Sequence, residues 1–414
     1  MPAFTLDMFQ TTGLAMLLFV LGRFLITRIA FLKRCCIPAP VVGGLIFAVV
    51  HLALYQGGIL QLTFDESVKN FFMTLFFTSV GYTACFRLLK RGGKKVFLFL
   101  LVAIIMVCLQ NVLSSVLAAL FNWDLRMGLC TGSIPMVGGH GTAGSYGPEL
   151  EKLGLAGAEV LAIAAATFGL VAGSLMGGPT ARSIISKYGL VSDESQDEIL
   201  EMSDETPEQK EHAELVDVNS FTNAAILLIV AAGLGTILTS LLNGITIMGA
   251  KLTFPTYIGS MVIAAIIRNY CDVKHIVLPS RSIDIWGNVS LSIFLAVALM
   301  TLKLWQLAEL AGPMIIMLAA QTLLMFVFAR YVVFNLMGRD YEAAVMTSAF
   351  CGFGMGATPN AMANMQVLTA QYGPAPQAYF IVPLVGSLFI DFFNGIIITA
   401  FLNVLPYVQN VLPF

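Results

Sequence analysis

Hydrophobic runs long enough to cross a lipid bilayer recur along the whole chain, with short polar stretches between them. A helix needs about 20 predominantly apolar residues to span the hydrocarbon core. On this criterion the sequence predicts ten membrane spans, at about residues 9–30, 37–60, 71–89, 96–121, 156–185, 221–242, 254–270, 285–302, 313–337 and 378–405. We therefore expect an all-α polytopic membrane protein.

Two glycine-rich stretches interrupt this pattern. Residues 133–144 and residues 351–360 are rich in residues that break helices, yet each lies among apolar runs. Irregular backbone at membrane depth leaves N–H and C=O groups without water, so it is tolerated only inside protein or around a polar cavity. The apolar arm at 127–137 is also too short to cross. We expect re-entrant hairpins at about residues 127–150 and 341–370.

Positive charge predicts the orientation of the chain, because loops rich in Lys and Arg stay in the cytoplasm. The cluster at 90–95 and the acidic linker at 191–219 are then cytoplasmic, and both termini are periplasmic. The first apolar run is expected to be a retained span, since no convincing cleavage site follows it. The basic residues left outside are Lys69, Arg126, Lys152, Lys251 and Lys303.

The spans divide into two halves, residues 1–190 and 220–414, with the acidic linker between them. Each half has five spans and one hairpin, and an odd number of crossings gives the halves opposite orientation, as in transporters with inverted repeats. Matching residues occur in the same order in both halves. They are Pro40 and Pro255, Gly44 and Gly259, Gln110 and Gln321, Asp124 and Asp340, Gly138 and Gly354, Thr142 and Thr358, Gly169 and Gly386, and Gly178 and Gly395.

Composition supports the membrane class. Of 414 residues, 58% are hydrophobic and 11% are charged, and the mean hydropathy is +0.86, whereas soluble domains have about 25% charged residues. A net charge of -2 without a long basic run gives no reason to expect a nucleic-acid partner. The seven cysteines lack metal-binding spacing, so we expect no disulfide, structural zinc or other cofactor.

The tips of the two hairpins are the candidate substrate site. Free N–H groups at the start of a half-helix favour an anion, and glycine allows a ligand to approach the backbone. The candidate substrate-binding residues are Gly138, Gly139, His140, Gly141, Thr142, Gly356, Thr358, Asn360 and Asn364. The alternative is that the glycines only permit close helix packing. His140 could act as a proton relay or ligand, or could cap the hairpin.

Asp391 lies in the middle of the last predicted span. A carboxylate there is costly unless it faces a cavity, a partner or an ion. Asn394 follows three residues later on the same helical face, and oxygen ligands of this kind suit a hard cation such as sodium. We expect a sodium site at Asp391 and Asn394, with Ser133 and carbonyl groups of the first hairpin. An ion pair is the alternative, although no Lys or Arg lies mid-span nearby.

Several motifs resemble those of the bacterial sodium/glutamate symporters, over nearly the whole chain outside the linker. They are residues 138–142, 166–170, 177–179, 287–292, 351–359 and 363–366. The resemblance implies a homodimer in the inner membrane, in which each protomer has a scaffold and a mobile transport domain that holds both hairpins. It implies import of L-glutamate with sodium by an elevator-like movement. The sequence departs from the family pattern at residues 134–137, where Pro135 lies.

Two other functions remain open. A carrier for a citrate-like or other dicarboxylate anion is possible, because backbone donors suit many carboxylates. An intramembrane enzyme that uses His140 and Asp391 is disfavoured, since the sequence offers no set of nucleophile, base and orienting group.

Overall fold

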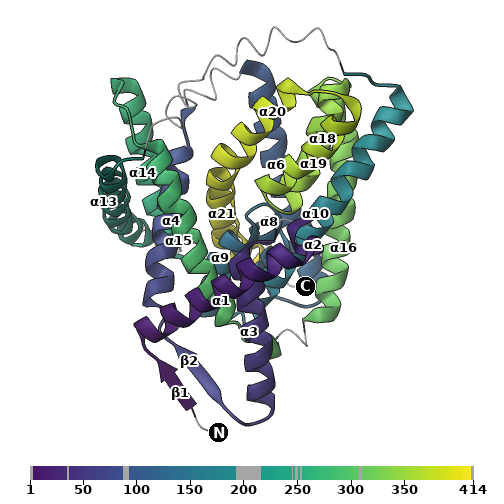
Figure 1. The fold of residues 1–414 in the computed structure, drawn as a ribbon. Coiled ribbons are helices and arrows are strands. Elements are labelled where there is room, and N and C mark those ends of the chain that lie inside the picture. The colour runs from purple at the N-terminus through teal and green to yellow at the C-terminus, as the bar shows by residue number, and fades with distance from the viewer. Residues whose placement is uncertain are drawn as a thin grey trace.

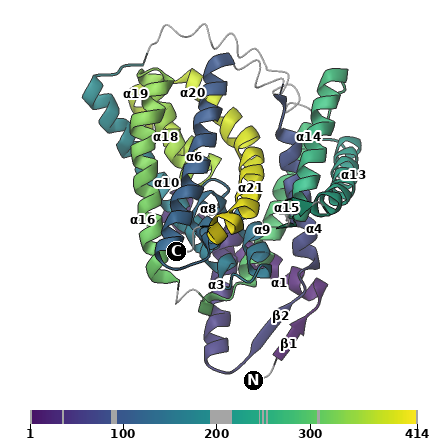
Figure 2. The same ribbon diagram turned by 180° about the vertical axis from the view of Figure 1, so that it is seen from behind.

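A computed structural model describes residues 3–34, 37–86, 93–192, 216–244, 246–247, 250–251, 254–306 and 310–411. The expected acidic linker lies mostly outside these residues. Long helices dominate the fold, and the two opposite views in Figures 1 and 2 show them gathered into two groups that lie side by side.

The elements of the N-terminal half follow the predicted spans closely. They are β1 (Ala3–Leu6), α1 (Met8–Arg28), α2 (Ala30–Arg34), α3 (Ala39–Gln56), β2 (Gln61–Phe64), α4 (Ser67–Thr83), α6 (Gly93–Leu120), α7 (Leu125–Gly128), the 3₁₀ turn η1 (Leu129–Thr131), α8 (Ser133–Met136), α9 (Gly139–Lys152) and α10 (Ala158–Tyr188).

The C-terminal half contains two π-helical turns. Its elements are α13 (Val218–Asn243), β3 (Thr246–Ile247), β4 (Ala250–Lys251), α14 (Thr256–Lys274), α15 (Ser280–Met300), the 3₁₀ turn η3 (Leu304–Gln306), α16 (Ala311–Phe328), the π-helix η4 (Ala329–Val333), α17 (Phe334–Met337), α18 (Tyr341–Met355), α19 (Thr358–Tyr372), α20 (Pro376–Pro383), the π-helix η5 (Leu384–Phe389) and α21 (Ile390–Val411).

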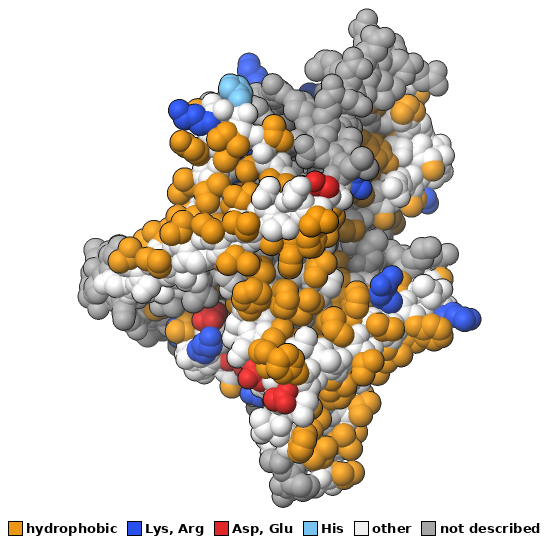
Figure 3. All heavy atoms as spheres, turned by 60° about the vertical axis from the view of Figure 1, so that its left-hand side comes forward, with side chains coloured by type: hydrophobic (Ala, Val, Ile, Leu, Met, Phe, Trp, Pro, Cys, Tyr) orange, Lys and Arg blue, Asp and Glu red, His pale blue; other side chains and the backbone are white. Residues whose placement is uncertain are grey.

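Eight helical stretches in the described residues are long and apolar enough to cross a membrane, so the protein is a polytopic membrane protein. The helices α4 and α14, with 17 and 19 residues, occupy two further predicted spans. Figure 3 shows that hydrophobic side chains cover most of the described part of one face and that charged side chains are few there. Such a surface is stable against lipid, whereas on a soluble monomer it would be a large exposed apolar patch.

Two small sheets depart from the purely helical class that the sequence predicts. The strands β1 and β2 pair in parallel, with Ala3 opposite Gln61 and Leu6 opposite Phe64, and β3 pairs with β4. All four strands lie between or before the predicted spans, in short polar connections. Edge groups of an open sheet need water, so these segments belong outside the hydrocarbon core.

The first bundle consists of α1, α3, α4, α13, α14 and α15. Its helix pairs approach closely at glycine: a Cβ placed on Gly22 of α1 would lie 1.9 Å from the Ala39 carbonyl oxygen, and one on Gly235 of α13 would lie 2.1 Å from the Ser260 Cα. Close approach through small residues is the usual way in which membrane helices gain packing energy.

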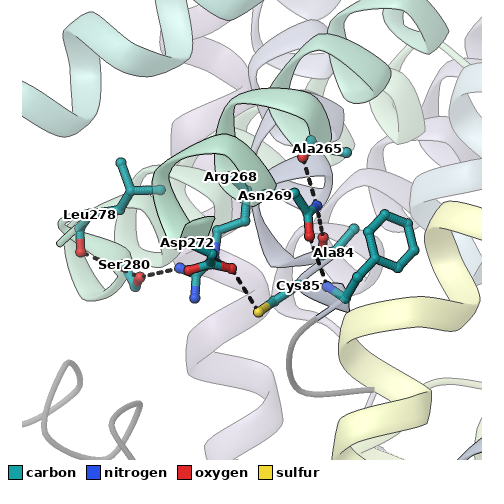
Figure 4. A network of polar contacts seen from close by, with 9 residues as sticks. Ala84, Cys85, Ala265, Arg268, Asn269, Asp272, Leu278 and Ser280 are labelled. Atoms are coloured by element: carbon teal, nitrogen blue, oxygen red, sulfur yellow. Dashed lines mark hydrogen bonds and ion pairs between the residues drawn. The ribbon is translucent and has the colours of Figure 1, made fainter. Parts of the chain in front are cut away.

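A polar network fixes one end of this bundle, as Figure 4 shows. The Cys85 thiol, just after α4, donates to the Asp272 carboxylate at 2.9 Å. Arg268 reaches the same carboxylate at 3.3 Å and the Ser280 hydroxyl at 2.9 Å. The Asn269 amide donates to the Ala84 carbonyl at 2.7 Å. The ends of α4 and α14 and the start of α15 are therefore held together.

The second bundle consists of α6–α10 and α16–α21. Its largest hydrophobic cluster is built from α6, α10 and α16–α21. Its contact with the first bundle includes aliphatic, aromatic and small residues. Tyr146 of α9 packs edge-on against Tyr257 of α14, with ring centroids 5.5 Å apart, and donates to the Gly395 carbonyl at 2.8 Å.

Candidate functional site

The first broken segment, residues 125–152, starts at an aspartate cap and breaks near glycine. Asp124 accepts the Arg126 backbone N–H at 2.8 Å and forms an ion pair with its guanidinium at 2.6 Å. The helix α8 ends at Met136, and α9 begins at Gly139, whose φ is 57°. Residues other than glycine rarely adopt this left-handed backbone conformation, so Gly139 allows the helix to break between α8 and α9.

The second broken segment, residues 341–372, starts in the same way. Asp340 caps α18 by accepting the Ala343 N–H at 2.7 Å. The backbone leaves the helix at Gly356 and Ala357, and α19 begins at Thr358. The two arms lie very close, since a Cβ on Gly352 would be 2.5 Å from the Ala361 nitrogen.

The structure brings the two breaks together. A Cβ on Gly139 would lie 3.2 Å from the Gly356 carbonyl oxygen. Two adjacent residues of α6 support both segments: the Gln110 amide donates to the Gly354 carbonyl at 2.8 Å, and the Asn111 Oδ1 accepts the Ser133 N–H at 2.9 Å. Gly139 and Gly356, which the sequence predicts as substrate-site residues, are therefore neighbours.

The candidate residues Asn360 and Asn364 are held by α10. The Asn360 amide nitrogen donates to the Leu170 carbonyl and to the Ser174 hydroxyl, each at 2.8 Å. The Asn364 amide nitrogen donates to the Gly173 carbonyl at 3.0 Å. In this arrangement both amide nitrogens connect α19 to α10.

Glycines spaced by four residues on α10 permit this packing. A Cβ would lie 2.2 Å from the Met355 carbonyl oxygen at Gly169 and 2.2 Å from the Asn364 Nδ2 at Gly177. These α10 glycines, which lie outside the two hairpins, therefore allow close helix packing. The packing interpretation that the sequence left open describes Gly141, whose added Cβ would lie 3.2 Å from the Phe76 ring.

The two candidate threonines differ in their hydrogen bonds. The Thr358 hydroxyl donates to the Gly386 carbonyl at 2.8 Å, which ties the first turn of α19 to the π-helix η5. Thr142 is 6% exposed and lies over Gly138, whose added Cβ would be 2.2 Å from the Thr142 Oγ1. Within the described residues the Thr142 hydroxyl makes no hydrogen bond.

His140 is positioned by α10. Its Nε2 lies 3.0 Å from the Thr167 Oγ1, and that hydroxyl donates its hydrogen to the Ile163 carbonyl at 3.1 Å. The Thr167 oxygen must then accept, which makes Nε2 the protonated ring nitrogen. His140 therefore has a hydrogen-bond partner on α10, and a purely structural role would require such a partner.

The candidate cation-binding residues Ser133 and Asn394 are in contact. The Asn394 Nδ2 donates to the Ser133 carbonyl at 3.2 Å. The Ser133 Oγ and the Asn394 Oδ1 are buried and have no hydrogen-bond partner among the described residues. Asp391 lies three residues before Asn394 in α21, is partly buried, and forms no ion pair within the described part of the chain.

Ser133, Asn394 and Asp391 carry oxygen groups, although only Ser133 and Asn394 are seen in contact with each other. Hydroxyl, amide and carboxylate oxygens are the ligands that hard cations prefer. A buried oxygen without a donor costs free energy that a bound cation would recover. The Ser133 N–H and carbonyl are both engaged by neighbouring helices, and its hydroxyl has no hydrogen-bond partner among the described residues.

Sequence reasoning missed the role of Asn111 and of Thr167. Asn111 lies in a strongly apolar span, and the available signal was an amide side chain in mid-span, which is expensive unless it has a partner. Thr167 lies in the motif at residues 166–170, but it was assigned no role, because a single hydroxyl can bond to its own helix.

Comparison with known proteins gives one consistent result. A family model described as Sodium/glutamate symporter matches residues 4–374. The chain is 38% identical over 402 residues to a Sodium/glutamate symporter of Escherichia coli (strain K12), which covers 96% of this chain and 98% of that protein. It is 36% identical over 412 residues to a Sodium/glutamate symporter of Haemophilus influenzae, which covers 99% and 100%. The similarity extends over nearly the whole chain.

Proposed function

The chain belongs to the sodium/glutamate symporter family and carries out sodium-coupled glutamate symport, and on this premise we propose where its ligands bind and how it moves. It is a multi-pass membrane transporter and not an enzyme. This removes the intramembrane enzyme from the functions that the sequence left open.

The proposed topology has two inverted halves, each with five spans and one re-entrant hairpin. The cytoplasmic linker joins the halves, and the termini are periplasmic in a bacterial inner membrane. Three helices of the first half and their proposed equivalents in the second half have the same residue type at the N-cap position. The pairs are Asp7 and Asp217, Asp124 and Asp340, and Pro38 and Pro255, although the sequence comparison of the halves matched Pro40 with Pro255.

Helix packing supports the same relation between the halves. The helix α3 packs on α15, and its equivalent α14 packs on α4. The contact of α3 with α15 therefore corresponds to the contact of α14 with α4 when the two halves are exchanged. This is expected when two halves of opposite orientation are related by an axis in the membrane plane.

L-Glutamate is proposed to bind where the two broken segments meet. The observation that carries this proposal is the contact of Gly139 with the Gly356 carbonyl, because it places two helix starts, α9 and α19, at one point. Helix starts carry free N–H groups and a positive dipole end that attract a carboxylate. The free Thr142 hydroxyl is one further donor at this point.

Sodium is proposed to bind at Asp391, Asn394 and Ser133. The two buried oxygens without donors support this placement. A cation there touches the first broken segment directly, through Ser133. Ion binding would thus favour the same closed arrangement that glutamate needs, and such shared preference is what couples two ligands.

Movement is proposed to follow the division into bundles. The first bundle is the scaffold and the site of homodimer contact, and the second bundle carries both broken segments and all proposed ligand-binding residues. Apolar and small residues fill much of the contact between them, and such a contact can slide with little change in hydrogen bonding. This is an elevator-like mechanism.

Purified protein in proteoliposomes tests the proposal. An inward sodium gradient should drive uptake of labelled L-glutamate, and collapse of the gradient should abolish accumulation. Unlabelled citrate and other dicarboxylates should compete weakly. Equal competition by citrate would favour the dicarboxylate carrier, and gradient-independent uptake would refute the sodium site.

A further inference from the structure

A lysine is buried where the two bundles meet. Lys69, in the first turn of α4, is 1% exposed. Its Nζ lies 3.0 Å from the Glu66 Oε1 and 3.9 Å from the Glu159 Oε1. Glu66 precedes α4 and belongs to the first bundle, whereas Glu159 lies in the first turn of α10 in the second bundle.

The two carboxylates have different surroundings. The side chain of Glu66 is 50% exposed, and that of Glu159 is 12% exposed. Burial of a lysine is tolerated only when its charge is compensated. Glu159 compensates the lysine charge from a buried position in the contact between the bundles. Glu66 compensates it from a half-exposed position.

We propose that the ion pair of Lys69 with Glu159 is a lock that stabilises the arrangement of bundles seen here and opens in every transport cycle. The proposal rests on the bundle movement proposed above. When the second bundle moves, Glu159 leaves, while Glu66 stays beside Lys69 and keeps the lysine compensated. A contact shifts an equilibrium only if it differs between the two states, and of the two ion pairs of Lys69 only that with Glu159 does so.

This difference between the carboxylates gives a matched pair of variants. Glu159→Gln keeps the size of the side chain and removes its charge, so it should reduce the ratio of the locked to the moved arrangement by about fivefold, the lower end of usual coupling factors. Glu66→Gln removes the carboxylate that lies nearer to the lysine, but this carboxylate belongs to the same bundle as Lys69 and stays beside it in both arrangements. The variant should leave the ratio unchanged.

Variants of Lys69 separate the lock from a folding defect. Lys69→Arg retains the charge and should keep most of the lock. Lys69→Met should act like Glu159→Gln, and the double variant Lys69→Met with Glu159→Gln should act no more strongly than either single change, because both remove one interaction.

Single-molecule energy transfer on the full chain in nanodiscs measures the ratio. Dyes are attached at Lys152→Cys, an exposed position at the end of α9, and at Ser240→Cys, an exposed position on α13, after replacement of the native cysteines. The expected result is two distances, with a ratio that Glu159→Gln shifts and Glu66→Gln does not. Equal shifts in both variants, no shift in either, or a single distance in the unmodified chain would overturn the lock.

Uptake by the unmodified protein separates this failure from failure of the proposed function. If sodium drives glutamate uptake and Glu159→Gln leaves the dye ratio unchanged, the lock alone is wrong. If uptake does not depend on sodium while the dye ratio shifts as expected, the lock stands and the proposed sodium site is wrong.

Discussion

Replacing Asp391 by asparagine should raise the sodium concentration that half-saturates glutamate uptake by about eightfold to twentyfold. The change keeps the shape of the side chain and removes its charge. A carboxylate at the centre of a membrane helix costs about 2.5 to 3.5 kcal/mol. No described basic side chain forms an ion pair with Asp391, so a bound sodium ion is the proposed source of compensation.

The magnitude follows from that cost and from the burial of Asp391. Each 1.4 kcal/mol corresponds to about a factor of ten in affinity. Because Asp391 is only partly buried, we expect about half of the full cost, which gives about 1.3 to 1.8 kcal/mol.

The assay is uptake of labelled glutamate into proteoliposomes over a range of sodium concentrations. Asp65→Asn is the matched control, because Asp65 lies in the connection before α4 and its carboxylate accepts the Ser67 N–H at 2.7 Å. The control should keep the sodium dependence of the unmodified protein. An unchanged half-saturating concentration in Asp391→Asn, with normal insertion, would remove Asp391 from the sodium site.

Three further substitutions test the other parts of the site. Gly139→Ala forces a left-handed residue and should lower the free energy of unfolding by about 1 to 2 kcal/mol, seen as a lower melting temperature, whereas Gly178→Ala meets no atom within 4 Å and should be neutral. Thr142→Ala should raise the half-saturating glutamate concentration more than Thr322→Ala, whose hydroxyl only bonds to its own helix; equal effects would place Thr142 outside the site. Gln110→Leu leaves the Gly354 carbonyl without its side-chain donor. It should reduce the effect of sodium on glutamate affinity, measured as the half-saturating glutamate concentration at high and at low sodium.

Much of the fold could be predicted because lipid imposes a simple rule. A span must be long and apolar, so runs such as that of α6 are visible in the sequence. The polar caps that end these runs are also visible, as at Asp124 and Asp340. The strands β1 and β2 were not predicted, since four residues in a polar connection carry too weak a pattern, and their pairing joins segments far apart in the chain.

The site was predictable only at the level of its segments. Glycine marks where the backbone must break, but it does not show which side the neighbouring amides face. Asn360 and Asn364 were expected to bind substrate, and the structure places their nitrogens on α10. A side chain's partner depends on helix rotation, and a pattern of residue types does not record that rotation.

Charge predicts an orientation that leaves a few basic residues outside. The rule that basic residues stay inside leaves some outside, and three of them are paired with acids close in sequence. Lys69 pairs with Glu66, Arg126 with Asp124, and Lys152 with Glu149. Pairing lowers the effective charge of the segment, which is compatible with the predicted position of these residues outside. The sequence identified Lys69 as such an exception, but it did not indicate that Glu159 of α10 is its second partner.

The position of α6 explains how one ion could govern two broken segments. Ser133 contacts the proposed sodium site through its hydroxyl and Asn111 through its backbone N–H. The next residue along the helix, Gln110, holds the Gly354 carbonyl in the other segment. A displacement at Ser133 therefore reaches the second segment through two adjacent residues of one rigid helix. Since coupling requires both ligands to favour the same arrangement, a path this short makes closure of one segment without the other costly.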